Sequence, residues 1–92
     1  MKVKWSKTSI KDLNHIFDYI EKEDRPETAR KSILKIINAV SQLERFPEIG
    51  RRGRVVGTKE LIIPSTPFII IYRLKDSVLE ILTILHHSRM WS

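Results

Sequence analysis

Apolar residues in the first half of the chain recur at helical spacing in two segments. The first set comprises Ile10, Leu13, Ile16, Phe17 and Ile20. Thr8 and Ser9 precede it, and Asp12 follows Ser9 by three residues, a pattern typical of a helix start. We predict a helix over residues 9–23, capped by Thr8 or Ser9.

The second helical pattern begins at Pro26, which the first turn of a helix tolerates. Its apolar set comprises Ala29, Ile33, Ile36, Ile37, Val40 and Leu43. Pro47 cannot continue the helix, so the prediction covers residues 26–45. The short break between the two segments predicts a pair of antiparallel helices.

From Lys59 onward the apolar residues form short runs rich in Ile, Leu and Val, which is typical of strands. We predict strands over residues 59–63, 68–74 and 78–85, and an edge strand over residues 3–5. Residues 68–74 are apolar on both faces, so this strand should be central. The order β-α-α-β-β-β predicts an α+β fold, a two-helix hairpin packed on a twisted, mainly antiparallel sheet.

Length and composition describe one small domain over residues 1–92. The chain has no cysteine and is 41% hydrophobic, so neither a disulfide framework nor a thiolate metal site is expected. No motif indicates a metal or a cofactor. The start lacks an apolar signal region and the longest apolar run is residues 68–72, so we expect a cytoplasmic protein without membrane contact.

Positive charge is concentrated in the second half of the chain. The formal net charge is +6, and residues 1–50 contribute 10 basic and 8 acidic side chains against 7 basic and 3 acidic in residues 51–92. A nucleic acid or an acidic protein segment is therefore the partner class that the charge favours.

Cationic and imidazole side chains supply the candidate chemistry. They are Arg51, Arg52 and Arg54 before the sheet, Arg73 on the central strand, and His86, His87 and Arg89 at the end. RNA cleavage through the 2′-hydroxyl needs a base, an acid and fixed positive charge, and these residue types can supply all three without metal.

Each candidate also has a purely structural interpretation. The arginine segment can be a phosphate or carboxylate clamp, or a solvated loop that its glycines make mobile. His86 and His87 are adjacent on a strand and should point to opposite faces, so at most one shares a site. The Arg73 head group should reach solvent or a carboxylate at the sheet margin. We expect Trp5 and Trp91 to cover the sheet rather than to stack on bases.

The chain as a whole resembles the RelE/ParE superfamily of bacterial type II toxin–antitoxin toxins. The resemblance rests on Trp5-Ser6, Asp12-Leu13, Ile16, Asp18-Tyr19-Ile20, Phe46-Pro47-x-x-Gly50-Arg51-x-Gly53-Arg54, Gly57-Thr58-Lys59-Glu60-Leu61, Thr66-Pro67-Phe68-Ile69-Ile70-Ile71-Tyr72-Arg73 and Ile84-Leu85-His86-x-x-Arg89-x-Trp91. It implies the same β-α-α-β-β-β fold. It also implies a cognate antitoxin whose acidic segment wraps the toxin, and contact with operator DNA only through that antitoxin.

The superfamily contains two activities on one fold. ParE-like members inhibit DNA gyrase, and RelE-like members cleave messenger RNA on the ribosome. At the strand positions where RelE-like proteins have lysines, this chain has Glu60 and Ile62. Phe68 stands where those proteins typically have an arginine at the start of a strand, so the sequence favours the ParE-like branch. An interface would then use Arg51, Arg52, Arg54, Lys59, Arg73 and Trp91.

The alternative is a ribosome-dependent endonuclease in which His86, His87 and Arg89 are catalytic. A third possibility is an inactive toxin that serves only with its antitoxin.

Overall fold

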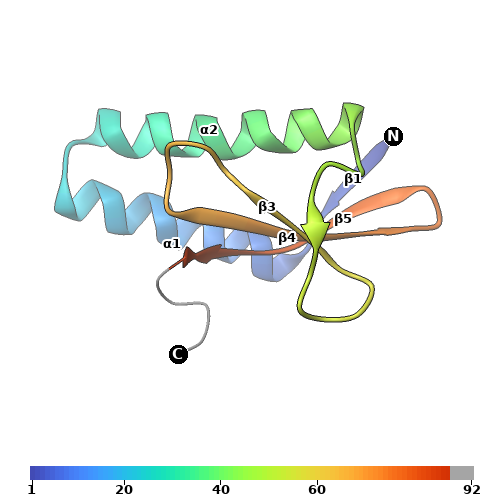
Figure 1. The fold of residues 1–92 in the computed structure, drawn as a ribbon. Coiled ribbons are helices and arrows are strands. Elements are labelled where there is room, and N and C mark those ends of the chain that lie inside the picture. The colour runs from blue at the N-terminus through green and yellow to red at the C-terminus, as the bar shows by residue number, and fades with distance from the viewer. Residues whose placement is uncertain (88–92) are drawn as a thin grey trace.

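The computed structural model describes residues 1–87 and has the predicted element order (Figure 1). The elements are β1 (Lys2–Trp5), α1 (Lys7–Glu23), α2 (Pro26–Arg45), β2 (Arg51–Arg52), β3 (Lys59–Ile62), β4 (Phe68–Lys75) and β5 (Val78–His86). No helix in this part of the chain is long and apolar enough to cross a membrane.

One five-stranded sheet runs in the order β1-β5-β4-β3-β2. β1 is an edge strand, as predicted, and pairs parallel with β5, while the other pairs are antiparallel. β4 is the central strand. The register between β4 and β5 shifts at Ile71 and Tyr72, where β5 carries Leu82 as an extra residue, and such a bulge increases the local twist of the sheet.

The first helix starts earlier than its sequence pattern predicts. The cap is Ser6 rather than Thr8 or Ser9: the Ser6 hydroxyl accepts a hydrogen bond of 2.9 Å from the Ser9 N–H. Ser9 is buried in the first turn and its hydroxyl donates to the Ser6 carbonyl. Asp12 makes no capping box, because its carboxylate accepts from Thr83 and from the Ile84 N–H of β5. Two neighbouring serines made the start ambiguous.

β2 is a strand that the sequence pattern did not predict. Arg51 lies opposite Glu60 and Arg52 opposite Lys59, so the segment expected to be a loop pairs with β3. The strand is two residues long and both side chains are exposed. Such a short polar segment carries no alternation of apolar and polar positions that could reveal it.

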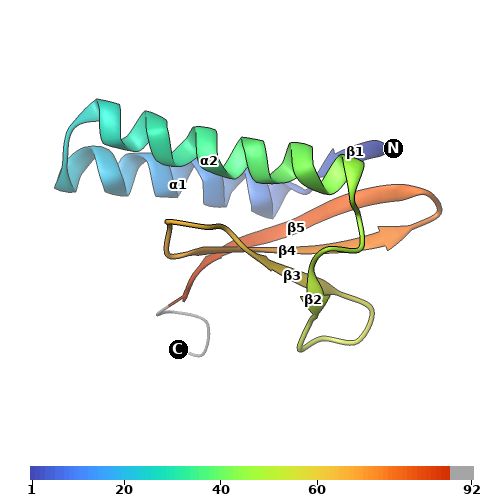
Figure 2. The same ribbon diagram turned by 45° about the horizontal axis from the view of Figure 1, so that its top comes forward.

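The core lies between the helix layer and one face of the sheet (Figure 2). Ile36, Val40 and Leu43 of α2 pack against Ile70 and Tyr72 of β4, and Trp5 packs at the margin of the same cluster. Ile10 and Ile37 were expected inside but are 49% and 43% exposed. Ile69 points to the opposite face by strand alternation and is fully buried, consistent with a central strand covered on both faces.

Candidate functional site

Four of the predicted cations lie in the arginine hairpin, which we define as residues 51–59. It comprises β2, a loop and the start of β3, and the chain between the strands projects away from the helix layer (Figures 1 and 2). These nine residues contain four basic side chains and no acidic one. The arginine hairpin is therefore a concentrated cationic feature of the surface.

Glu60, the residue of β3 that directly follows the arginine hairpin, holds the hairpin in place. Its side chain is only 5% exposed. Arg51 Nη2 donates to Glu60 Oε1 over 3.2 Å, and the Arg54 N–H donates to Glu60 Oε2 over 3.1 Å. A buried carboxylate needs such partners, so Glu60 fixes both the first strand and the start of the loop.

Tyr72 anchors the segment that leads into the arginine hairpin. Its hydroxyl accepts from the Gly50 N–H over 2.9 Å and donates to the Pro47 carbonyl over 2.8 Å. A Cβ atom at Gly50 would lie 2.5 Å from that hydroxyl oxygen, so the close approach requires glycine. Burial raises the pKa of Tyr72, the Gly50 N–H opposes this, and Glu48 adds to the rise.

The tip of the arginine hairpin displays two apolar side chains. Val55 is 68% exposed and Val56 is 98% exposed. Gly57 has φ +86°, a conformation that other residues rarely adopt. The Val55 carbonyl accepts from both the Thr58 N–H and the Thr58 hydroxyl. These hydrogen bonds close a turn that leaves both valines exposed to solvent.

Lys59 and Arg73 are both paired with carboxylates. Lys59 Nζ lies 3.3 Å from Glu48 Oε2. Arg73 Nε donates to Glu80 Oε1 over 2.8 Å across the β4–β5 pair, which confirms the prediction that Arg73 reaches a carboxylate or solvent. That hydrogen bond is the main cause of a lowered pKa of Glu80 and a raised pKa of Arg73.

The two histidines at the end of β5 lie in different environments, as their adjacency predicts. His86 is half-buried and makes an edge-to-face contact with Phe68, with ring centroids 5.6 Å apart. His87 is exposed and its N–H donates to the Pro67 carbonyl over 2.6 Å. Beside His86 an open cleft of about 490 Å³ is also lined by His15, Tyr19 and Lys22 of α1.

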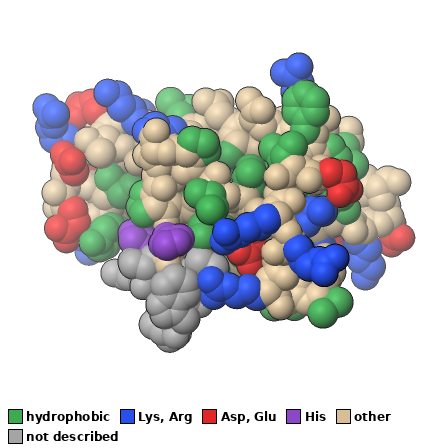
Figure 3. Space-filling model, in the orientation of Figure 1, with side chains coloured by type: hydrophobic (Ala, Val, Ile, Leu, Met, Phe, Trp, Pro, Cys, Tyr) green, Lys and Arg blue, Asp and Glu red, His purple; other side chains and the backbone are tan. Residues whose placement is uncertain are grey.

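Within residues 1–87, the predicted arginines of β2 and β4 lie away from His86. His86 lies opposite Phe68, and Arg73 is five positions further along β4, about 17 Å at the usual rise per residue. Arg51 is separated from His86 by about 14 Å across three strand spacings and about 10 Å along them. Figure 3 shows several basic side chains near β2, and the histidines lie to their left on the same face.

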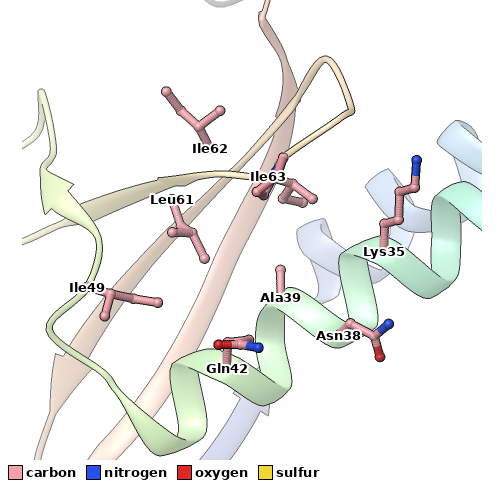
Figure 4. Close-up of a pocket in the computed structure, with 9 residues that line it drawn as sticks. Lys35, Asn38, Ala39, Gln42, Ile49, Leu61, Ile62 and Ile63 are labelled. Carbon is pink, nitrogen blue, oxygen red and sulfur yellow. The ribbon is translucent and has the colours of Figure 1, made fainter.

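A second hollow lies between α2 and β3 (Figure 4). This groove has a volume of about 430 Å³ and its lining includes Ala39, Ile49, Leu61 and Ile62, with Lys35 at one end. Ile49 and Ile62 are about half exposed, at 50% and 48%. The groove adjoins the start of the arginine hairpin, so an apolar channel continues into a cationic surface.

Two predicted residues, Arg89 and Trp91, lie outside the described residues. Within residues 1–87 no cluster of three or more His, Asp or Glu side chains could hold a metal ion. Three important residues escaped the sequence analysis: Glu60 was considered only as a missing lysine, while Tyr72 and Glu48 had no assigned role. The position of Glu60 next to an arginine-rich segment was the one sequence feature that could have predicted its pairing with an arginine.

Comparisons with known proteins identify the family. The family model described as "ParE toxin of type II toxin-antitoxin system, parDE" matches residues 3–91. Y4kP of Sinorhizobium fredii is 38% identical over 90 residues, covering 98% of this chain and 92% of that protein. Toxin RelE2 of Caulobacter vibrioides is 30% identical over 88 residues, covering 96% and 97%.

Solved structures agree with the family match. A structure of the chromosomal ParDE system from P. aeruginosa superposes with a TM-score of 0.87 at 30% identity, covering 94% of this chain and 95% of that chain. The E. coli RelBE toxin–antitoxin complex gives a TM-score of 0.58 at 10% identity, covering 90% and 92%, and so shares the fold alone. The chain belongs to the ParE toxin family of type II toxin–antitoxin systems, within the RelE/ParE superfamily.

Proposed function

We propose that this ParE-family toxin inhibits growth by binding DNA gyrase, and that a cognate antitoxin neutralises it. The observation that carries the choice of target is the separation, within residues 1–87, of His86 from Arg51 and Arg73. An endonuclease needs its acid and base within hydrogen-bond reach of one phosphodiester. A protein that acts through an interface has no such requirement, because binding energy is distributed over a surface.

Ion pairing of the cations also supports an interface. Arg51 is bonded to Glu60, Lys59 to Glu48 and Arg73 to Glu80. In RNA cleavage, fixed positive charge must be aimed at the phosphate where charge develops. Cations that are held by neighbouring carboxylates are better suited to shaping a surface than to that task.

The antitoxin surface that we propose is the groove between α2 and β3 together with the arginine hairpin. Apolar residues of an acidic antitoxin segment would fill the groove at Ile49, Leu61 and Ile62, and its carboxylates would face the adjoining arginines. Complementary charge would speed association and apolar burial would slow release. The similarity to the chromosomal ParDE toxin–antitoxin system of P. aeruginosa supports such a partner.

The test is a brief induction of the toxin from a tightly repressed promoter. Within minutes, covalent gyrase–DNA complexes and the 5′ ends of ribosome-bound transcripts are measured in the same culture. We expect trapped gyrase complexes, intact messages and arrest that antitoxin co-expression relieves.

Cleaved messages with unaffected DNA would replace the gyrase target with the ribosome and make His86, His87 and Arg89 the residues to substitute. Normal growth in spite of confirmed expression would show an inactive toxin. Either result contradicts the proposal.

A further inference from the structure

The tip of the arginine hairpin combines two features that are seldom exposed together. Val55 and Val56 are among the most exposed hydrophobic residues of the described chain, at 68% and 98%. Arg52 and Arg54 precede them and are exposed as well. A hydrophobic pair held in water beside guanidinium groups suits a partner that offers both negative charge and an apolar surface.

The arginine hairpin is organised before any partner binds. Gly53 N–H donates to the Thr58 carbonyl over 2.8 Å, which closes the loop. Glu60 holds Arg51 and the Arg54 backbone, and Tyr72 holds Gly50. These bonds lie below the tip, so they fix its backbone without covering the valines. A preordered loop loses little conformational entropy on binding.

The charge of the arginine hairpin is only partly compensated. Glu60 and Glu48 pair with Arg51 and Lys59. Within residues 1–87, Arg52 makes no ion pair. It lies two residues from Arg54 and three from Val55, so cation and apolar tip would meet the same partner.

Duplex DNA is the partner class that fits this combination best. A two-stranded ribbon fits the major groove, arginines bind phosphates, and apolar side chains contact thymine methyl groups or enter between base steps. Protein hot spots are enriched in Trp, Tyr and Arg but poor in Val. Membrane-surface segments rely on Trp, Phe and Leu, none of which occurs in residues 51–59.

We propose that the arginine hairpin binds duplex DNA directly, with Arg52 and Arg54 on the phosphates and Val55 and Val56 against the bases. This contact differs from operator binding through an antitoxin. It also does not depend on gyrase as the target, because the free toxin alone would make it.

The experiment measures binding of the full chain to a short fluorescent duplex by anisotropy over a range of salt concentrations. Three variants are compared with the unaltered protein: Arg52→Ala, the double variant Val55→Ser/Val56→Ser, and Arg30→Ala. Arg30 is an exposed cation near the start of α2, far from the arginine hairpin, and serves as the matched control for lost charge. Thermal unfolding checks that each variant is folded.

We expect the unaltered protein to bind with a Kd of about 10⁻⁴–10⁻⁶ M, as non-specific DNA contacts do. Arg52→Ala should weaken binding and reduce the slope of log K against log salt by about 1. The valine variant should weaken binding without changing that slope, because it removes no charge. Arg30→Ala should leave affinity and slope unchanged.

The proposal is overturned if the unaltered protein does not bind the duplex, or if Arg52→Ala and Arg30→Ala behave alike. It is also overturned if the arginine-hairpin variants bind DNA normally and lose binding only to purified gyrase. That result would assign the tip to a protein partner and would leave the gyrase proposal intact.

Discussion

The arginine hairpin and the end of β5 are positioned by different kinds of contact. At the arginine-hairpin end, the buried groups Tyr72 and Glu60 bond to the backbone of Gly50 and Arg54. At the end of β5, the half-buried His86 ring contacts Phe68 edge to face, and the backbone N–H of His87 donates to the Pro67 carbonyl. Buried hydrogen-bonding side chains therefore position the first segment, while an aromatic contact and a backbone hydrogen bond are among the contacts of the second.

This difference identifies the surface segment whose backbone is positioned by buried polar side chains. A buried carboxylate and a buried phenol are costly unless satisfied, and both serve the segment that displays the arginines and valines. Arginine-rich, glycine-containing segments are commonly taken to be mobile. Here the interior of the domain determines the shape of the surface loop.

Loss of the Tyr72 side chain should have the largest effect. Tyr72→Ala empties a fully buried position and should lower the free energy of unfolding by about 3–5 kcal/mol. Tyr72→Phe keeps the ring and should cost about 1–3 kcal/mol, because Gly50 N–H and the Pro47 carbonyl lose their partner. Denaturant unfolding measures both. An unaffected Tyr72→Phe variant would show that the anchor is unimportant.

Crowding at Gly50 should be the next largest effect. Gly50→Ala places a Cβ atom 2.5 Å from the Tyr72 hydroxyl, so the tyrosine and the loop cannot both keep their positions. We expect a cost of about 1–3 kcal/mol. Gly57→Ala is an informative comparison, because its Cβ would meet no atom within 4 Å and only the positive φ opposes it. Equal costs would argue against the close contact.

Replacing Glu60 and Glu80 one at a time should show that a buried ion pair contributes more to stability than an exposed one. Glu60→Ala leaves the partly buried Arg54 N–H without its acceptor and should cost about 1–3 kcal/mol. Glu80→Ala breaks a more exposed pair and should cost less. Urea titration of both variants tests the order. A larger loss for Glu80→Ala would contradict the expectation that the more buried carboxylate contributes more to stability.

Acid should weaken the Arg73–Glu80 pair. The hydrogen bond from Arg73 holds the pKa of Glu80 below its usual range. Its stabilisation is therefore fully present above the pKa of an unfolded glutamate, about 4.3, and is lost as pH falls through the lower folded pKa. The small stability difference between the unaltered protein and Glu80→Gln should disappear in acid. A difference that grows below that range contradicts this assignment.

Alkali should act on Tyr72, the residue beside Arg73 on β4. Burial raises the pKa of Tyr72, so its contribution is complete below the usual tyrosine pKa and is lost as pH rises through the higher folded value. Tyrosinate absorbance should show a late-titrating group that is missing in Tyr72→Phe. Its persistence in that variant would assign the raised pKa to another group.

Periodicity was sufficient for the helices and the long strands, because each buries a repeating apolar face. The central position of β4 followed from its two apolar faces. The need to place a guanidinium at the sheet margin predicted that Arg73 reaches solvent or a carboxylate, but did not identify Glu80. β2 could not be predicted, since two exposed arginines have no pattern. The start of α1 was misplaced because Ser6 and Ser9 are both suitable caps.

The site was harder to predict than the fold for a physical reason. Arg51, Arg52 and Arg54 were recognised from their type, but what fixes them is Glu60 and Tyr72, which act through tertiary contacts. Tyr72 is 22 residues from Gly50, whose N–H donates to the Tyr72 hydroxyl. Sequence alone indicates which residues are chemically capable, whereas strand pairing decides which of them meet.

One growth measurement tests most directly whether the toxin acts through the arginine hairpin or the histidine end. Two double variants, Arg52→Glu/Arg54→Glu and His86→Ala/His87→Ala, are induced to equal levels beside the unaltered toxin, with folding of each purified variant checked by thermal unfolding. We predict that the arginine variant loses growth inhibition, while the histidine variant keeps it within a few-fold. Loss of inhibition by about 100-fold or more in the histidine variant alone, as expected of an acid–base enzyme, would contradict the account.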